Sequence, residues 1–311
     1  MLRAFRPSDV PALFPLLDRH FPEENALLGW TPAAFDRTVR RIYRWDARLF
    51  LALLSLAGRP VFRFFAIEAD RRLVGTTLLT YAARAGFVSL VMVDGPYRRR
   101  GFARRLVGAA IAATARSGRR HVALDVLDSN APARALYAAL GFRRLRSLTL
   151  WSGPVGSVPP PLPAAAHVRP FRRSDAGPIA AIASAQLRPE VAEVLPVGPG
   201  DFDDSAWVAR ALASESEAWV AVDGAGAPRG FVRATASATT TAGHLAAPVI
   251  ADELDPATED ALLAAALGWL AGRGRSTLVC ELADTNARGA ALLGRSGFVP
   301  ALAAETQVRA V

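Results

Sequence analysis

Short apolar runs, bounded by polar and turn residues, recur through the first half of the chain. Three of them cover residues 63–69, 72–81 and 87–93. Runs of this length between turn signals predict β-strands. Residues 104–117 then combine Ala, Leu and Arg at helical spacing, and residues 121–126 form another apolar run. A strand, a crossing helix and a further strand in this order predict an α/β fold.

Further helices are expected on both sides of these strands. A Ser-Asp pair before residue 10 is a typical N-cap and predicts a helix to about residue 19. A Thr-Pro pair opens a second predicted helix over 31–44, and the apolar stretch 45–57 is expected to continue it. Residues 131–140 predict a later helix, and residues 143–151 a final strand.

The pattern of the first half recurs in the second half at a shift of 156 residues. This shift places Asn130 on Asn286, and the Gly-Phe pair that ends the first copy also has a counterpart in the second. A Pro-rich stretch lies between the copies and predicts an extended spacer. The sequence therefore predicts two copies of one domain, at 1–151 and 167–311, joined by a linker at 152–166.

The turn between the strand 87–93 and the helix 104–117 has the pattern Arg-x-x-Gly-x-Ala. A turn at this place directs backbone N–H groups toward one point, at the positive end of the helix dipole. Small side chains there would let a diphosphate approach the backbone. The residues expected to bind it are Arg98, Arg99, Arg100, Gly101, Phe102 and Ala103.

A second motif, Asn-x(6)-Tyr-x(3)-Gly-Phe, follows at 130–142. The two motifs together resemble the GNAT family of acetyl-CoA-dependent N-acyltransferases. The resemblance implies two tandem GNAT folds, each a mixed twisted sheet flanked by helices. It also implies that the fourth and fifth strands separate to admit acetyl-CoA, and that no metal is needed.

The resemblance assigns roles to several residues of the first copy. The main chain of Val91, Met92 and Val93 is expected to pair with the pantetheine arm, while their side chains belong to the core. Asn130 would contact the same arm in addition to capping a helix. Tyr137 would protonate the departing thiolate of coenzyme A. The alternative for Tyr137 is a core aromatic residue.

Asp125 is the candidate general base, because ribosomal-protein N-terminal acetyltransferases of this family carry a Glu at the same spacing before the Asn. The alternative is a carboxylate at a strand end that forms a salt bridge with one of the many arginines. His20, Glu23 and Glu24 are expected in a loop that borders the acceptor. The acids could bind a cationic amine and His20 could relay a proton, or these charges could simply be solvated.

The second copy differs from the first where the chemistry is expected. The shift of 156 replaces Gly101 by Ala257, Ala103 by a glutamate and Tyr137 by a leucine. An acidic residue at a diphosphate site would repel the ligand. We therefore expect a degenerate second domain with a structural or acceptor-cleft role. The alternative is a second domain that binds a different ligand.

Composition adds few constraints. The net charge is +9, with 25 arginines and 11 acids in residues 1–151 and with 12 arginines and 17 acids in residues 152–311. The phosphates of coenzyme A are a sufficient anionic partner for the basic half, and no nucleic-acid partner is expected. Cys280 is the only cysteine, which excludes a disulfide framework and indicates a buried thiol. No signal peptide or membrane span is apparent, so a cytoplasmic enzyme is expected.

The function expected from these features is direct acetyl transfer from acetyl-CoA to a primary amine in a ternary complex. Within the enzymes, the alternatives are a mycothiol-synthase-like acyltransferase and an enzyme that modifies aminoglycosides or polyamines. A non-catalytic acyl-CoA-binding scaffold is the alternative from another class. The acceptor is a small-molecule or peptide amine, and the protein a monomer with pseudo-dimeric domains or a homodimer. The apolar segment 49–56 is a candidate for the lining of a larger acyl pocket.

Overall fold

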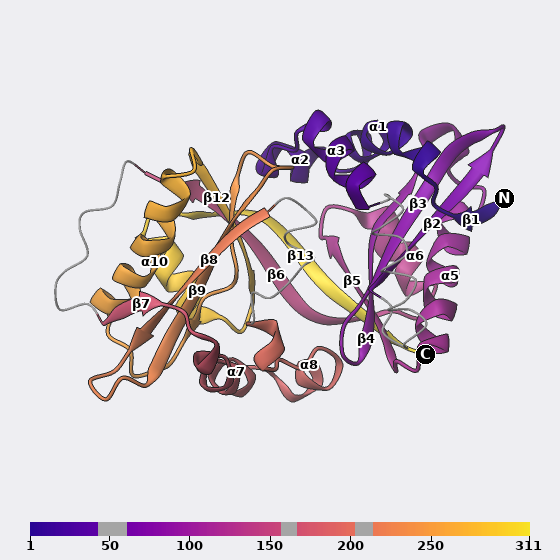
Figure 1. Cartoon of the computed structure of the whole chain (residues 1–311). Helices are drawn as coiled ribbons and strands as arrows, with labels where there is room; N and C mark the ends of the chain where they lie inside the picture. The colour runs from indigo at the N-terminus through magenta and orange to yellow at the C-terminus, as the bar shows by residue number, and fades with distance from the viewer. Residues whose placement is uncertain (43–60, 157–166, 203–213) are drawn as a thin grey trace.

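A computed structural model describes residues 1–42, 61–156, 167–202 and 214–311. These residues form one thirteen-stranded sheet with helices packed on it (Figure 1). The elements of the first half are β1 (Leu2–Ala4), η1 (Pro7–Asp9), α1 (Val10–His20), α2 (Pro22–Leu28), α3 (Pro32–Ile42), β2 (Phe62–Ala69), β3 (Arg72–Tyr81), β4 (Ala85–Val93), η2 (Gly95–Tyr97), α5 (Phe102–Arg116), β5 (His121–Leu127), α6 (Ala131–Ala138) and β6 (Arg143–Pro154). Those of the second half are β7 (Val168–Pro170), η3 (Arg173–Asp175), α7 (Ala176–Ala185), α8 (Pro189–Val194), η4 (Pro199–Asp201), β8 (Ser214–Val222), β9 (Pro228–Ser237), β10 (Gly243–Leu245), β11 (Val249–Ile250), α10 (Pro256–Ala271), β12 (Thr277–Ala283), α11 (Ala287–Arg295) and β13 (Val299–Ala310).

The strands run in the order β1-β2-β3-β4-β5-β13-β6-β12-β10-β9-β8-β7, and β11 pairs with β9. The pairs β4–β5 and β10–β12 are parallel, and the other pairs are antiparallel. The sheet is therefore mixed, and the expected α/β fold class is confirmed.

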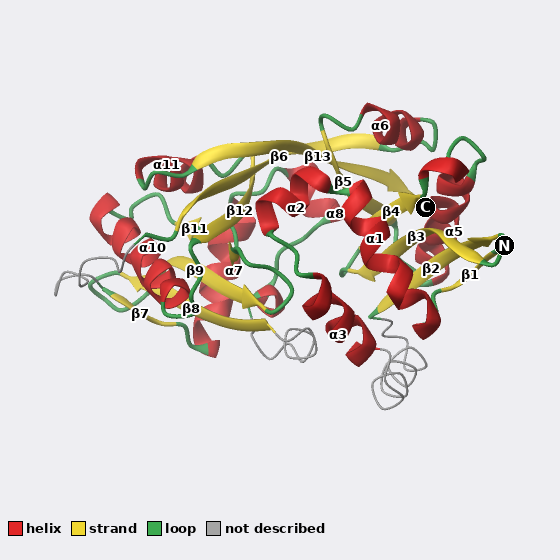
Figure 2. Ribbon diagram, turned by 90° about the horizontal axis from the view of Figure 1, so that it is seen from above, coloured by secondary structure: helices red, strands yellow, loops and turns green. Residues whose placement is uncertain are grey.

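The two halves exchange their last strands. β13, from the end of the chain, lies between β5 and β6, whereas β6 pairs with β13 and with β12 of the second half. Figure 2 shows β6 and β13 running side by side between α11 and α6. The strand predicted for 143–151 continues to Pro154 and so includes the first residues of the expected linker.

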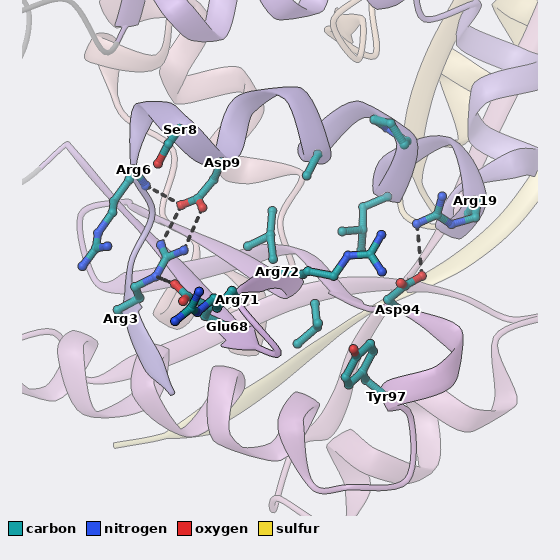
Figure 3. Close-up of a pocket in the computed structure, with 15 residues that line it drawn as sticks. Arg3, Arg6, Ser8, Asp9, Arg19, Glu68, Arg71, Arg72, Asp94 and Tyr97 are labelled. Carbon is teal, nitrogen blue, oxygen red and sulfur yellow. Dashed lines mark hydrogen bonds and ion pairs between the residues drawn. The ribbon is translucent and has the colours of Figure 1, made fainter.

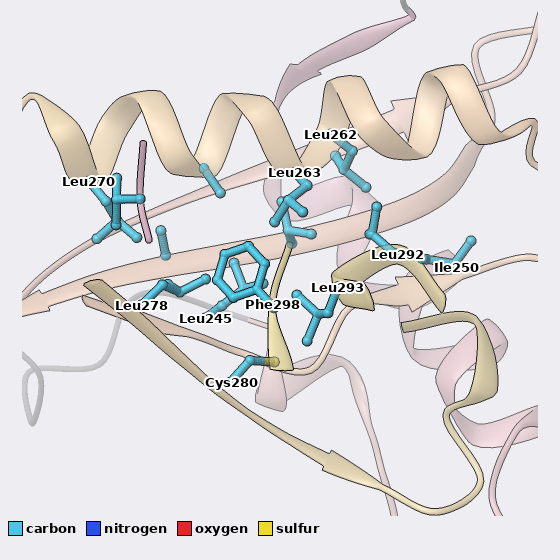
Figure 4. Packing of buried hydrophobic residues seen from close by; sticks show 14 of the residues in the cluster. Leu245, Ile250, Leu262, Leu263, Leu270, Leu278, Cys280, Leu292, Leu293 and Phe298 are labelled. Carbon is cyan, nitrogen blue, oxygen red and sulfur yellow. The ribbon is translucent and has the colours of Figure 1, made fainter. Parts of the chain in front are cut away.

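Each half has its own core, on the sheet face that carries its longest helix. Val122, Leu124 and Val126 of β5 alternate toward this core and pack beneath α5 and α6. In the second half Leu278, Cys280 and Leu282 of β12 form a core with α10 and α11 (Figure 4). Cys280 is 1% exposed, and burial raises the pKa of its thiol. The expectation of a buried thiol is confirmed.

The first 30 residues depart from the prediction. The carboxylate of Asp9 does not cap α1; it accepts two hydrogen bonds from Arg3, both 2.7 Å long, and one from the backbone N–H of Arg6. β1 and α2 were not expected. His20 is the last residue of α1, and Glu23 and Glu24 lie in α2 rather than in a loop. The arginine that holds Asp9 lies six positions earlier, outside the range of a capping pattern.

Some expectations fall on residues outside the described part of the chain. These are the helix at 45–57, the apolar segment 49–56 and most of the linker at 152–166. Among the helices that the structure describes, none has the length and apolar character needed to cross a bilayer.

Candidate functional site

An opening between β4 and β5 lies in the middle of the first half. The two strands pair from Ala85–His121 to Val88–Leu124 and no further, although β4 continues for five residues. Within those residues Leu90 has a φ of +52°, and the register of β4 against β3 shifts there, as in a β-bulge. The bulge redirects β4 away from β5, so the strands separate just before Asp125.

Beyond the bulge, the β4 side chains belong to the core. Met92 is 1% exposed and packs beneath α1, and Val93 packs against Leu106 of α5. Val91 is half-buried beside the core under α5 and α6. The side chains of all three residues are thus used in packing.

The loop after β4 ends at the N-terminus of α5. Gly101 is the N-cap, with a φ of +75°, and a Cβ built there would meet no protein atom within 4 Å. Arg99 also has a positive φ, +64°, and both Arg99 and Arg100 are exposed. The first turn of a 15-residue helix therefore faces open space. Such a turn can bind an anion through its free N–H groups.

Arg98 holds this loop to the end of α1. Its Nε donates to the carbonyl of Val93 at 3.2 Å, and its Nη2 lies 3.0 Å from Nδ1 of His20. Burial and the charge of Arg98 lower the pKa of His20, which favours a neutral imidazole that accepts from the guanidinium. His20 therefore supports the loop, a contact that its sequence position did not indicate.

Asn130 and Tyr137 lie at the two ends of α6. The side chain of Asn130 accepts a hydrogen bond of 3.2 Å from the backbone N–H of Ala133, as expected of a cap. Tyr137 is 6% exposed and packs against Phe142 with 5.8 Å between ring centroids. Burial raises the pKa of its phenol to about 12. Its hydroxyl has no hydrogen-bond partner among the described residues.

Asp125 lies on the other face of the sheet. It is the first residue of β5 beyond the last pair with β4, and its side chain points away from the core that contains Tyr137. Thr306 of β13 donates to Oδ1 of Asp125 at 2.7 Å, and Nε of Arg146 donates to the Thr306 hydroxyl at 3.1 Å. The carboxylate forms no ion pair within the residues that the structure describes, so the salt-bridge alternative has no direct support.

Asp125 is exposed to solvent, yet the surrounding protein raises the pKa of its carboxyl group. The hydrogen bond from Thr306 and the charge of Arg146 oppose that rise. Thr306 and Arg146 were not anticipated from the sequence. No local pattern links them to Asp125, because the strand exchange is what places β13 beside β5 and β6 beside β13.

The second half holds α2 in place. The backbone N–H of Thr31 donates to Thr239 at 2.9 Å, and that of Thr241 donates to Gly29 at 2.9 Å. Arg275 in turn donates to carbonyl groups of the same β9–β10 loop. The helix that carries Glu23 and Glu24 is thus fixed from both halves of the chain.

The two acids of α2 differ in environment. Glu23 is exposed and accepts a hydrogen bond of 3.4 Å from the hydroxyl of Ser129, just before α6. Glu24 is half-buried, and burial, then the charge of Glu23, raises its pKa. Glu23 is thereby linked to the segment after β5, near the opening.

The equivalent region of the second half is filled by protein groups. The carboxylate of Asp255 caps α10 by accepting from the N–H of Thr258 at 2.9 Å and from its hydroxyl at 2.7 Å. Glu259, 2% exposed, pairs with Arg288 and Arg295. Carboxylates of the protein therefore already occupy the place at this helix N-terminus where an anionic ligand would bind.

A cavity of about 510 Å³ lies elsewhere, beside α1 and the turn between β2 and β3 (Figure 3). Five arginines line it, but Arg3 pairs with Asp9 and Arg19 pairs with Asp94. None of the residues expected to bind acetyl-CoA or the acceptor lines this cavity. Its volume alone does not make it the reaction site.

Comparison with known proteins agrees with the geometry. The model of the acetyltransferase (GNAT) family matches residues 21–142. The chain is 44% identical over 139 residues to the N-alpha-acetyltransferase MAK3 of Arabidopsis thaliana, an alignment that covers 45% of this chain and 63% of that protein.

Solved structures match the whole chain. A tandem GNAT protein from the clavulanic acid biosynthesis pathway has a TM-score of 0.66 at 17% identity, over 100% of this chain and 98% of that one. A GCN5-related N-acetyltransferase from Sphaerobacter thermophilus has a TM-score of 0.65 at 16% identity, over 100% and 95%. At such identities these likenesses show the fold alone. The whole chain therefore has the fold of tandem GNAT proteins, and residues 21–142 in its first half match the GNAT family of acetyltransferases.

Proposed function

We propose that this chain is an acetyl-CoA-dependent N-acetyltransferase that transfers the acetyl group directly to a primary amine while both substrates are bound. One observation carries the proposal. The strands β4 and β5 part at the Val88–Leu124 pair, with Asp125 next on one sheet face and Tyr137 packed on the other. A thioester in that opening would lie between a carboxylate and a phenol.

The described residues fit acetyl-CoA. The open space at Gly101 would accept the diphosphate against the first N–H groups of α5, with the exposed Arg99 and Arg100 nearby. The backbone of residues 91–93 would pair with the pantetheine arm, and Asn130 would contact it. When bound, acetyl-CoA supplies an activated acetyl thioester.

Asp125 would accept the proton that the attacking amine loses, directly or through a water molecule. As the C–N bond forms and the C–S bond breaks, the proton passes to the carboxylate and the electron pair to sulfur. The hydrogen bond from Thr306 fixes the orientation of the carboxylate. Because the surrounding protein raises its pKa, Asp125 is a stronger base than a fully solvated aspartate.

Tyr137 would stabilise the sulfur as it leaves. Its pKa of about 12 lies above the value of about 8.5 typical of a thiol, so full proton transfer from the phenol would be uphill. The hydroxyl would therefore act by donating a hydrogen bond to the developing thiolate, which then takes a proton from solvent. A hydroxyl without a partner among the described residues is free to do so.

We further propose that the first half, through β6, forms the catalytic unit and that residues 167–311 complete its acceptor side, with the stretch after Pro154 as the linker. Two sets of contacts support this assignment of roles. Thr306 contacts Asp125, and the β9–β10 loop contacts α2. The filled helix N-terminus at Asp255 supports a second unit that does not bind coenzyme A. The acceptor would be a small-molecule or peptide amine.

Replacing Tyr137 by Phe separates a catalyst from a scaffold. We expect Tyr137→Phe to lower kcat roughly 100-fold, the usual contribution of such a group, with the coenzyme A affinity unchanged. The free energy of unfolding should not fall, because the hydroxyl has no partner among the described residues to lose. Steady-state assays with a panel of amines and calorimetric titration of coenzyme A measure these quantities.

Tyr81→Phe is the matched control, since the hydroxyl of Tyr81 likewise has no hydrogen-bond partner among the described residues but lies on β3. It should leave kcat unchanged. If Tyr137→Phe keeps full turnover, Tyr137 is a core aromatic. If the wild-type protein binds coenzyme A but acetylates no amine in the panel, the scaffold alternative holds.

A further inference from the structure

The cavity beside α1 carries positive charge that the proposed reaction does not use. Five arginines and three carboxylates line it, which leaves two positive charges in excess. The carboxylates are already paired within the protein. Asp9 and Glu68 both accept from Arg3 at 2.7 Å, and Asp94 accepts from Arg19 at 3.0 Å. Two of the five arginines therefore account for all three acids.

The other three arginines are Arg6, Arg71 and Arg72. Each is exposed, and none forms an ion pair or a side-chain hydrogen bond with a residue that the structure describes. Figure 3 shows the side chain of Arg72 lying between the ion pairs of Arg3 and of Arg19. The excess charge thus lines the cavity itself, and a guanidinium group lies in its middle.

The turn between β2 and β3 holds two of these arginines. Asp70 and Arg71 form the turn with φ values of +50° and +58°, and Arg72 follows as the first residue of β3. The hydroxyl of Tyr97 donates to the carboxylate of Asp70 at 2.8 Å and ties the turn to the η2 segment. Two adjacent cations are therefore held beside the cavity on a turn that is attached to a second element.

The second half shows which of these charges the fold itself needs. Arg169 pairs with Asp175 at 2.7 Å, as Arg3 pairs with Asp9 in the first half. Both aspartates also accept from a backbone N–H three positions earlier. An ion pair that recurs in both halves serves the fold, so it does not explain the excess charge.

The second half neutralises the arginine at its corresponding turn. Arg229, at the start of β9, pairs with Asp223 at 2.8 Å and with Glu253 at 3.0 Å. The shift of 156 places Tyr97 on Glu253. The first half therefore has a tyrosine where the second half has a neutralising acid. An anion from outside the chain would supply the missing negative charge.

The charge and the size of the cavity indicate the class of anion. A phosphate monoester carries about two negative charges at neutral pH, and guanidinium groups bind it through paired hydrogen bonds. The cavity volume of about 510 Å³ is that of a small-molecule site, and Ala12 and Leu73 add apolar surface to its lining. We propose that this cavity binds a phosphate dianion, either free or carried by a small phosphorylated molecule.

This site is separate from the one proposed for coenzyme A. Asp94 and Tyr97 of the preceding segment line the cavity, whereas none of the described residues 98–103 does. The inference does not depend on acetyl transfer. A protein without acetyltransferase activity could still bind phosphate here.

The test is calorimetric titration of the whole protein with ribose 5-phosphate, in the presence and in the absence of coenzyme A. We expect one binding event under both conditions, and none with ribose. Ribose 5-phosphate that binds more tightly than inorganic phosphate would identify a phosphorylated molecule as the ligand. Equal affinities would identify free phosphate.

Arg72→Gln should weaken the binding of ribose 5-phosphate tenfold or more, as expected for the loss of a charge-assisted hydrogen bond. Arg72→Lys keeps the charge without the planar fork and should lose less. Arg116→Gln is the matched control, because Arg116 is an exposed arginine at the end of α5 with no partner in the described part of the chain. It should leave the affinity unchanged.

Three results would overturn the inference. The wild-type protein could bind neither ribose 5-phosphate nor phosphate, or Arg72→Gln could bind as tightly as Arg116→Gln. Binding that coenzyme A abolishes would place the phosphate at the N-terminus of α5 instead. Thermal melting checks that each variant is folded, so a loss of binding in Arg72→Gln reports on the cavity.

Discussion

At the scale of single residues, Gly101 has two separate reasons to be glycine. Its φ of +75° is a conformation that other residues adopt at a cost, and the space where a Cβ would stand holds no protein atom within 4 Å. The first reason concerns stability and the second concerns the ligand. A second glycine in the same half allows the two to be measured apart.

Gly118, at the end of α5, has a φ of +74° and equally open surroundings. We expect Gly101→Ala and Gly118→Ala each to lower the free energy of unfolding by about 1 kcal/mol, because both place Ala in the left-handed region. Only Gly101→Ala should weaken coenzyme A binding, by tenfold or more, since its methyl group would occupy the ligand space. Urea denaturation and calorimetry measure the two effects. Equal coenzyme A affinities in the two variants would show that the ligand does not approach this turn.

At the scale of elements, β13 completes the half to which it does not belong in sequence. On one face Thr306 holds Asp125, and on the other Glu305 pairs with Arg134 of α6 at 3.1 Å. Arg309 donates to the carbonyl of Leu140 at 2.7 Å, just beyond the same helix. The last strand of the chain thus supports both the candidate base and the helix that carries Tyr137.

Replacing Thr306 tests this support through pH dependence. A base must be deprotonated to work, so kcat/KM should fall as the pH drops through the pKa of Asp125. The Thr306 hydroxyl stabilises the charged carboxylate and lowers that pKa. Thr306→Val should therefore move the acid limb of the profile upward by about one pH unit, as expected for one hydrogen bond to a charged group.

Thr306→Ser keeps the donor and should restore the wild-type profile. If the acid limb of the kcat/KM profile stays at the wild-type pH in Thr306→Val, the pKa of Asp125 does not determine that limb. Glu281, Arg146 and the acids of α2 are the other charged groups near this site, so the same profile measured in Glu281→Gln shows whether that carboxyl group titrates instead.

At the scale of the whole molecule, two related halves have diverged around one sheet. Figure 1 shows both chain ends on the side of the first half, because β13 crosses back to pair with β5. The first half presents an open helix N-terminus at Gly101. The second presents one closed by Asp255 and by the ion pairs of Glu259. The N-terminus of α5 is therefore open to an anionic ligand. The N-terminus of α10 is occupied by carboxylates of the chain.

This difference predicts one coenzyme A per chain. We expect a calorimetric stoichiometry near one, since a diphosphate at α10 would meet the carboxylates of Asp255 and Glu259. Gly101→Ala should weaken that single binding event. A stoichiometry of two, or binding that is indifferent to Gly101→Ala, would place coenzyme A in the second half.

The parts of the fold that depend on neighbours along the chain could be predicted from the amino-acid sequence. The strand 72–81 and the cap at Asn130 were predicted correctly, because alternation and capping act over a few residues. The partners of the strands could be identified only from the three-dimensional arrangement of the two halves. Thr306 reaches Asp125 across 181 positions, and strand pairing at that separation depends on how the two halves pack. The internal repeat did not indicate this contact, because the shift of 156 residues places Leu150 on Thr306.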